Sequence, residues 1–170
     1  MWKRRSSHLE LERRVREEYI CQIRGVTNLL INRKLVAVCQ AEANLPSQIS
    51  DIDGNLVTCG LDGTIRTWTQ EGSIIKSFAA HEAPVRALVK TGKFAITGGR
   101  DGRLKVWDWE NRQWLFDLQN SVPTVWKVAT MHRKLAIASW MKGELYHIQI
   151  WELDEIQEAA SKYISREKSS

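Results

Sequence analysis

Apolar residues along most of the chain alternate with polar residues or form short runs, and most runs end at a turn-forming pair such as Asp-Gly or Thr-Gly. This pattern is typical of β-strands joined by tight turns. The clearest stretch predicts four strands near residues 85–90, 94–98, 103–108 and 113–118. Asp101-Gly102 would form the turn between the second and third strands, because glycine adopts a positive φ without steric cost.

The same pattern returns with a period of about 40 residues. The segment Asp62–Trp68 (DGTIRTW) is repeated 39 residues later as Asp101–Trp107 (DGRLKVW). A looser third copy matches Leu135–Ser139 to Phe94–Gly98 and ends at Trp151. A single four-stranded unit cannot bury both of its faces, so units of this kind stack on their neighbours.

Four residues of the middle copy resemble the WD40 repeat family: His81 before the first strand, Thr97 in the second, Asp101 in the turn and Trp107 in the third. Asp108 follows and completes the Trp-Asp dipeptide. In the family these four side chains form a hydrogen-bonded chain inside each blade, and the resemblance implies the same structural role here. A buried Asp and His need such partners, because unpaired buried polar groups are costly. The neighbouring copies keep part of the set, namely Thr58, Asp62 and Trp68 in the first and Ser139 and Trp151 in the last.

The resemblance implies an all-β fold, a partial WD40 β-propeller of about three and a half four-stranded blades. Its units are predicted around 46–82, 83–120 and 121–153, after a half unit over 25–45. A propeller typically needs four to eight blades to close. We therefore expect the ring to be completed by self-association or by further blades.

The flanks of the repeats, which span 25–153, predict two short helices. Residues 1–24 form a charged amphipathic helix with a single apolar stripe, and residues 154–170 form a C-terminal helix and tail. Packing of the first helix on a blade is favoured over a role as a basic helix that binds phosphate or membrane, because its acidic residues offset most of its positive charge.

Composition narrows the class of protein further. The 170 residues include 25 Lys and Arg against 20 Asp and Glu, for a modest net charge of +5. Cys21, Cys39 and Cys59 are odd in number and have no paired spacing, which predicts reduced thiols and a cytoplasmic or nuclear protein. No apolar run approaches the roughly 18 residues that span a bilayer, so we expect no membrane partner.

Catalytic motifs are missing from the sequence. It contains no glycine-rich phosphate loop with a lysine, no Cys-x-x-Cys and no His-Glu-x-x-His. Asp62 and Asp101 each belong to the turn of their own repeat, so structural roles are favoured over a catalytic carboxylate pair. We expect no enzyme activity, no cofactor and no metal site. Trp126 and Trp140 lack the repeat's spacing, and core packing is favoured for them over a position facing a ligand.

Two arginines of the middle unit are candidate ligand-binding residues. Arg86 follows the first residue of the first strand, and Arg100 immediately precedes the Asp-Gly turn. Both positions can reach the top face of a propeller, where arginine binds phosphate bidentately and stays charged. The alternative is that both are simply exposed charges. Gln48 and Leu61 occupy the matching positions of the preceding unit.

A narrower resemblance rests on His81–Arg86 (HEAPVR) and Thr97–Gly102 (TGGRDG), which look like blades of F-box/WD-repeat proteins, the substrate receptors of ubiquitin ligases. In that family, arginines at these two positions bind a phosphorylated degron. We therefore expect a non-catalytic protein-interaction module that recognises phosphorylated substrates for ubiquitination. The alternatives are a generic scaffold without a ubiquitin role and, from the +5 charge and the eight tryptophans, a nucleic-acid binder.

Overall fold

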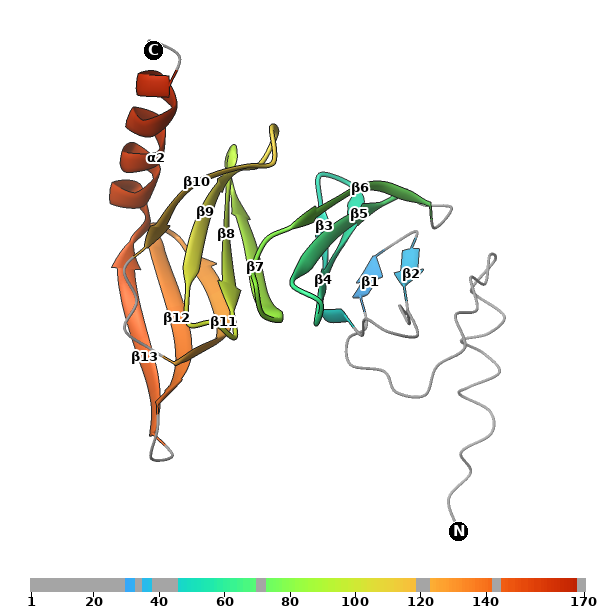
Figure 1. Ribbon diagram of the computed structural model, residues 1–170, viewed down its shortest axis with the longest axis horizontal. Coiled ribbons are helices and arrows are strands. Elements are labelled where there is room, and N and C mark those ends of the chain that lie inside the picture. Colours follow the sequence, from blue (N-terminus) through green and yellow to red (C-terminus); the bar gives the residue numbers. More distant parts are fainter. Residues whose placement is uncertain are drawn as a thin grey trace.

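Antiparallel β-sheets follow one another along the chain, and a helix comes after the last of them (Figure 1). The computed structural model describes residues 30–32, 35–37, 46–69, 73–118, 123–141 and 145–167. The elements are β1 (Leu30–Asn32), β2 (Leu35–Ala37), β3 (Pro46–Ile52), β4 (Asn55–Gly60), β5 (Thr64–Trp68), β6 (Ile74–Ala79), β7 (Val85–Thr91), β8 (Phe94–Gly99), β9 (Leu104–Asp108), β10 (Gln113–Leu118), β11 (Thr124–Met131), β12 (Lys134–Met141), β13 (Leu145–Glu152) and α2 (Leu153–Glu167).

Each full unit of the predicted repeat is one sheet. The first sheet has the strand order β3-β4-β5-β6 and the middle sheet the order β10-β9-β8-β7. Before them, β1 and β2 pair as a two-stranded sheet, which corresponds to the predicted half unit. These sheets confirm the prediction of an all-β fold built as a partial propeller. The last sheet, β11-β12-β13, has three described strands where the repeat predicts four.

The Asp-Gly turns need glycine for two reasons. Gly63 and Gly102 have φ values of +80° and +76°, which side chains other than glycine rarely adopt. At Gly63, an added Cβ would also lie 2.1 Å from the carbonyl oxygen of His81. The Gly63 carbonyl in turn accepts hydrogen bonds from the amides of Ala80 and His81, at 2.9 and 3.1 Å. The turn of the first sheet therefore holds the entry to the middle sheet in place.

Apolar side chains fill both spaces between the three larger sheets. Close approach of the middle and last sheets depends on Gly98, where a Cβ would come within 2.4 Å of a methyl group of Val125. The cluster between the first and middle sheets consists of Ile52, Val57, Cys59, Ile65, Ala80, Val85, Leu88, Ala95, Trp107 and Trp109. The cluster between the middle and last sheets includes Ala87, Ile96, Leu104, Val106, Leu115, Val125, Val128, Leu135 and Ile137.

Helix α2 completes the second of these cores. Leu153, Ile156 and Ala160 are buried in it, and the helix contacts β10 and β12. Asp154 and Glu155 lie in the first turn of α2, where negative charge favours the helix dipole. Among the described residues, no helix is long and apolar enough to cross a membrane. The helix predicted over residues 1–24 lies outside the described residues.

Candidate functional site

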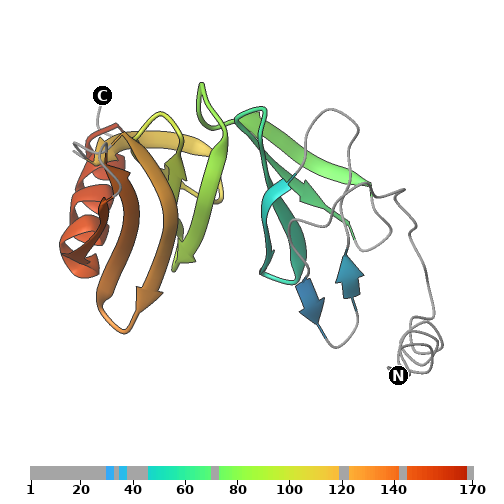
Figure 2. The ribbon, with the colours of Figure 1, turned by 90° about the horizontal axis from the view of Figure 1, so that it is seen from below.

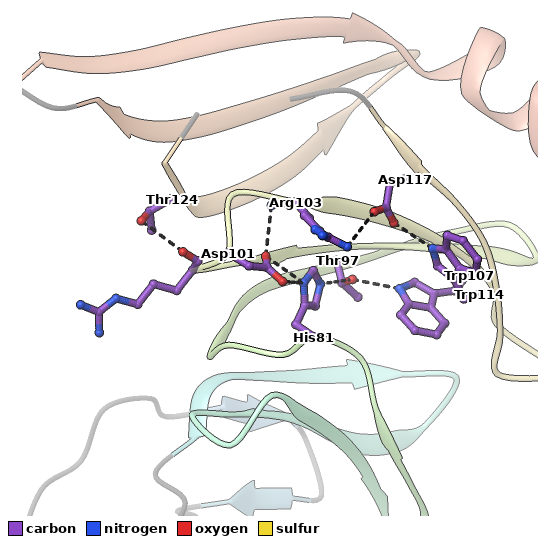
Figure 3. Close-up of polar contacts among 9 residues, drawn as sticks. His81, Thr97, Asp101, Arg103, Trp107, Trp114, Asp117 and Thr124 are labelled. Carbon is purple, nitrogen blue, oxygen red and sulfur yellow. Dashed lines mark hydrogen bonds and ion pairs between the residues drawn. The ribbon is translucent and has the colours of Figure 1, made fainter. Parts of the chain in front are cut away.

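Four side chains of the middle sheet form a continuous chain of hydrogen bonds (Figure 3). The indole nitrogen of Trp107 donates to the hydroxyl of Thr97 at 2.9 Å, and this hydroxyl lies 2.8 Å from Nε2 of His81. On the other side of the ring, Nδ1 lies 2.9 Å from a carboxylate oxygen of Asp101. The second oxygen of Asp101 accepts the amide of Arg103 at 3.1 Å. This chain ties the turn, the second strand and the third strand of the sheet to the segment that enters it.

The chain of hydrogen bonds favours neutral His81. With the proton on Nδ1, the ring donates to Asp101 while Nε2 accepts from Thr97, so both nitrogens are satisfied. Burial lowers the pKa of His81 below its ordinary value, and this effect outweighs the hydrogen bond to Asp101, which raises it. Further charges act on the ring from Lys105, which lowers its pKa, and Asp117, which raises it.

We expect the folded state to lose stability as the pH falls through about 6.5, the ordinary pKa of histidine in an unfolded chain. Because the pKa of His81 is lower in the folded state, the unfolded state takes up the proton first. The contribution of His81 is therefore complete above about pH 6.5 and decreases toward its folded-state pKa. Urea unfolding at about pH 7.5 and about pH 5.5 measures this effect. His81→Gln should show a smaller pH dependence, and an unchanged dependence in that variant would contradict the assignment.

The first sheet holds its turn aspartate in a different way. The indole of Trp68 again donates to a threonine, Thr58, at 2.9 Å. Asp62, however, forms an ion pair with Arg66 at 2.6 Å and also accepts the hydroxyl of Thr64. Partial burial acts to raise the pKa of Asp62, but the hydrogen bonds from Arg66 and Thr64 outweigh it and lower the pKa to about 2. Asp62 is therefore ionised and structural.

The last sheet lacks the hydroxyl that accepts the indole in the other two. This hydroxyl belongs to Thr58 in the first sheet and to Thr97 in the middle sheet. The pairing of β12 with β13 places Ile137 at the equivalent position of the last sheet. The prediction of Ser139 at this position was wrong. Ser139 lies two residues further along, where its hydroxyl donates to the carbonyl of His147 at 3.4 Å. The prediction differs from the structure because the sequence match compared residue types and took no account of how β12 pairs with β13.

A β-bulge occurs at the start of the first strand of each of the three larger sheets. The register shifts at Ser47, Arg86 and Trp126, so these three residues are equivalent. Two of them contact the next sheet: the hydroxyl of Ser47 donates to the carbonyl of Val85, and the guanidinium of Arg86 lies 4.9 Å from the ring centre of Trp126. The sequence match placed Gln48 at the position of Arg86, but the register shows that Ser47 occupies it. The side-chain amide of Gln48 bonds the backbone of Leu88 inside the stack of sheets.

A second set of equivalent residues lies at the end of the second strand of each of the three larger sheets. Leu61, Arg100 and Trp140 come directly after the residues that pair with the start of each first strand. All three are exposed. The amide of Arg100 donates to the carbonyl of Pro84 at 2.9 Å, which places Arg100 beside the segment that leads into β7. We call the six residues Ser47, Leu61, Arg86, Arg100, Trp126 and Trp140 the arginine–tryptophan edge.

The tryptophans of this edge are more exposed than their sequence context suggests. Core packing was favoured for Trp126 and Trp140, but they are 42% and 38% exposed. Trp126 is the extra residue of a bulge, which takes it out of the inward alternation of its strand. The signal available in the sequence was the match of Val125-Trp126 to Val85-Arg86, which places Trp126 at an arginine position.

Arg86 and Arg100 give the arginine–tryptophan edge its positive charge. Among the ion pairs of the described residues, none includes Arg86 or Arg100. Nε of Arg86 is buried and has no hydrogen-bond partner within the described part of the chain. Stacking on Trp126 orients the guanidinium of Arg86 and stabilises its charge. Arg86 therefore has unused hydrogen-bonding capacity, and Arg100 beside it is an exposed cation.

Among the described residues, we find neither a group of side chains suited to a metal ion nor a reactive thiol. No group of three or more His, Cys, Asp or Glu side chains there could hold a metal ion. Burial raises the pKa of Cys59 to about 12, and this outweighs the opposing charge of Lys127. Cys59 therefore stays protonated and unreactive in the folded protein.

Comparison with protein families agrees with the fold. Residues 34–69 and 72–108 match the family described as WD domain, G-beta repeat. Solved structures also resemble the chain. The WD40 β-propeller domain of Doa1 aligns with a TM-score of 0.52 and 18% identity over 61% of this chain and 35% of that one. The computationally designed Ika4 protein aligns with a TM-score of 0.61 and 18% identity over 76% and 91%. These structures support the fold alone, and the repeats imply a non-catalytic protein-interaction module.

Relatives with similar sequences match about one third of the chain. Telomerase protein component 1 of Mus musculus is 39% identical over 57 residues, which are 33% of this chain and 2% of the relative. Ribosome biogenesis protein YTM1 of Vanderwaltozyma polyspora is 36% identical over 61 residues, 35% of this chain and 14% of the relative. Topless-related protein 2 of Arabidopsis thaliana is 35% identical over 60 residues, 33% and 5%. The chain thus corresponds to a small part of each relative.

Proposed function

We propose that this chain, which carries WD40 repeats over residues 34–69 and 72–108, binds a peptide with a phosphorylated serine or threonine on its arginine–tryptophan edge. It would act without catalysis, as a protein-interaction module. The observation that carries the proposal is the pair Arg86 and Arg100, which have no ion-pair partner among the described residues and share an edge with exposed tryptophans.

The two arginines suit a phosphate group in charge and in geometry. Val85 pairs with Gly99 across two antiparallel strands, so Arg86 and Arg100, which each follow one member of this pair, lie on either side of it. A phosphorylated side chain carries a charge of about −1.5 to −2 at pH 7 and several acceptor oxygens. Guanidinium groups bind such oxygens bidentately, and Arg86 is already oriented by Trp126.

The tryptophans favour a peptide over a free phosphate ion. Trp126 and Trp140 flank the arginines on the side of the last sheet, and Leu61 is the equivalent exposed residue on the side of the first sheet. Tryptophan and arginine are the residues that most often dominate protein–protein binding energy. Apolar residues next to the phosphorylated position would contact Trp126, Trp140 and Leu61, while the phosphate binds between them.

In a narrower form of this proposal, the chain recognises phosphorylated proteins so that a ubiquitin ligase can modify them. This form rests on the resemblance of residues 81–86 and 97–102 to F-box/WD-repeat receptors. A generic interaction scaffold without a ubiquitin role is the second candidate, because the same edge binds peptides whatever happens to them afterwards. In either form the protein would act in the cytoplasm or nucleus, where its cysteines stay reduced.

A pair of matched peptides tests the proposal. We expect peptides with phosphothreonine between apolar residues, drawn from a degenerate set, to bind at least about tenfold more tightly than the same peptides without phosphate, as measured by fluorescence anisotropy. Arg86→Lys and Arg100→Lys should each remove much of this preference, because lysine keeps the charge and loses the bidentate geometry. Arg133→Lys is the matched control, since Arg133 is paired with Asp154 and lies outside the edge.

Three results would contradict the proposal. Equal affinity for phosphorylated and unphosphorylated peptides, or full binding after loss of both arginines, would leave only the generic scaffold. Tight binding of a single-stranded oligonucleotide with a steep salt dependence would favour the nucleic-acid alternative. Circular dichroism of each variant shows whether the fold is retained.

A further inference from the structure

One face of the last sheet is apolar and exposed. On β13, Ile148 and Ile150 are 73% and 67% exposed. Their partners across the strand pair are Ala138 and Ala136 of β12, which lie on the same face. Ala129 of β11 pairs with Ala136 and extends this face to the third strand. We call Ala129, Ala136, Ala138, Ile148 and Ile150 the outer face of the last sheet.

The equivalent positions of the other two sheets are buried. Strand register makes Ile148 and Ile150 the counterparts of Leu104 and Val106 in the middle sheet, both 0% exposed. The corresponding residues of the first sheet, Ile65 and Thr67, are also buried. The position of Ile65, Leu104 and Ile148 thus carries an aliphatic residue in all three sheets. In the first and middle sheets it faces the next sheet, and in the last sheet it faces no described part of the chain.

What covers these positions elsewhere is another sheet of the same kind. Strand β7 contacts β3 and β4 of the first sheet, and β11 contacts β7 and β8 of the middle sheet. Small residues permit this close approach, since Gly98 lies where a Cβ would meet Val125. Ala138 is the counterpart of Gly98 on the outer face. The outer face therefore has the shape and polarity of a surface that receives a WD40-type sheet.

Other described elements of the chain are not placed to cover it. Helix α2 packs into the core on the opposite side of the last sheet, together with Leu135 and Ile137. The two-stranded sheet β1–β2 lies beside β3, at the other end of the row of sheets (Figures 1 and 2). The charges at the outer face are few: Lys127, and the ion pair of Lys134 with Glu152. They leave the aliphatic centre of the face uncharged.

We propose that the outer face of the last sheet docks a second copy of this chain, so that two copies close one propeller ring. Each copy would place its β1–β2 end on the outer face of the other, around a two-fold axis. Four sheets per copy, three larger ones and one of two strands, give a ring of eight sheets in a pair, which is within the range of about four to eight blades of closed propellers. The same contact would form twice in the ring, once at each junction between the copies. No docking surface would then be left for a third copy.

The mass of the full chain in solution tests this inference. In sedimentation equilibrium at about 1 to 100 μM, we expect a reversible species of twice the 19.6 kDa chain mass. The double variant Ile148→Lys, Ile150→Lys should weaken association by at least about 100-fold, because it would bury two unpaired ammonium groups in the contact. Both side chains are exposed within one chain, so the variant should keep the circular dichroism of the parent.

Ile74→Lys is the matched control, since Ile74 is an exposed isoleucine of the edge strand β6 and lies outside the outer face. It should associate like the parent. A parent chain that stays monomeric throughout would overturn the inference and leave a different polypeptide as the occupant of the face. Open-ended growth with concentration would overturn the two-copy ring. Dimers that persist in the double variant would place the contact elsewhere. None of these results depends on phosphopeptide binding.

Discussion

Replacing Leu104 with alanine should lower the free energy of unfolding by about 2–5 kcal/mol. Leu104 is fully buried on β9, in the core between the middle and last sheets. Alanine would lose the burial of the removed carbons and leave a cavity, because strands on both sides hold the two sheets apart. Urea unfolding followed by tryptophan fluorescence measures the loss.

A control on the surface separates packing from the change of residue type. Leu61→Ala makes the same substitution at an exposed leucine, and its effect should stay within about 0.5 kcal/mol. Similar losses in the two variants would mean that the middle and last sheets do not pack on one another. Such a result would also remove the basis for equating Ile148 with Leu104.

Replacing Asp101 with alanine should destabilise the protein by about 1–3 kcal/mol. The carboxylate accepts hydrogen bonds from the His81 ring and from the amide of Arg103, and the His81 side chain is fully buried. Alanine would leave the Nδ1–H of His81 without an acceptor in a place that water reaches poorly. The measurement is urea unfolding at about pH 7.5, where His81 is neutral.

Asp154→Ala is the matched control for this variant. Asp154 forms an exposed ion pair with Arg133, and exposed pairs contribute little, so the change should stay within about 0.5 kcal/mol. Equal losses in the two aspartate variants would show that the hydrogen-bonded chain through His81 and Thr97 contributes no specific stability. A Thr97→Val variant gives an independent reading, because it removes the hydroxyl that joins the ring to Trp107.

Interactions between residues close in sequence made much of the fold predictable. Alternation of apolar residues and the turns at Asp62-Gly63 and Asp101-Gly102 specify strands and hairpins locally. The strands predicted near 85–90 and 94–98 are observed as Val85–Thr91 and Phe94–Gly99. The repeat then extended the same reasoning to the first sheet.

The composition of the candidate site was harder to predict, because it depends on register. Each of the three larger sheets has a bulge at the start of its first strand, and the register there makes Ser47 the equivalent of Arg86, although the sequence match paired Gln48 with Arg86. The same effect hid Trp126, whose bulged position turns it outward. In β12, alignment by residue type selected Ser139, but pairing with β13 places Ile137 at the threonine position.

By itself, the sequence determined the 40-residue repeat, the strands within it and the all-β class, because propensity, alternation and turn chemistry act over a few residues. Only the tertiary structure decided which side chains share the arginine–tryptophan edge and which face of the last sheet is left exposed. Both depend on how segments about 40 residues apart pack together. A shift of one residue in register exchanges the two faces of a strand, and no local pattern specifies that shift.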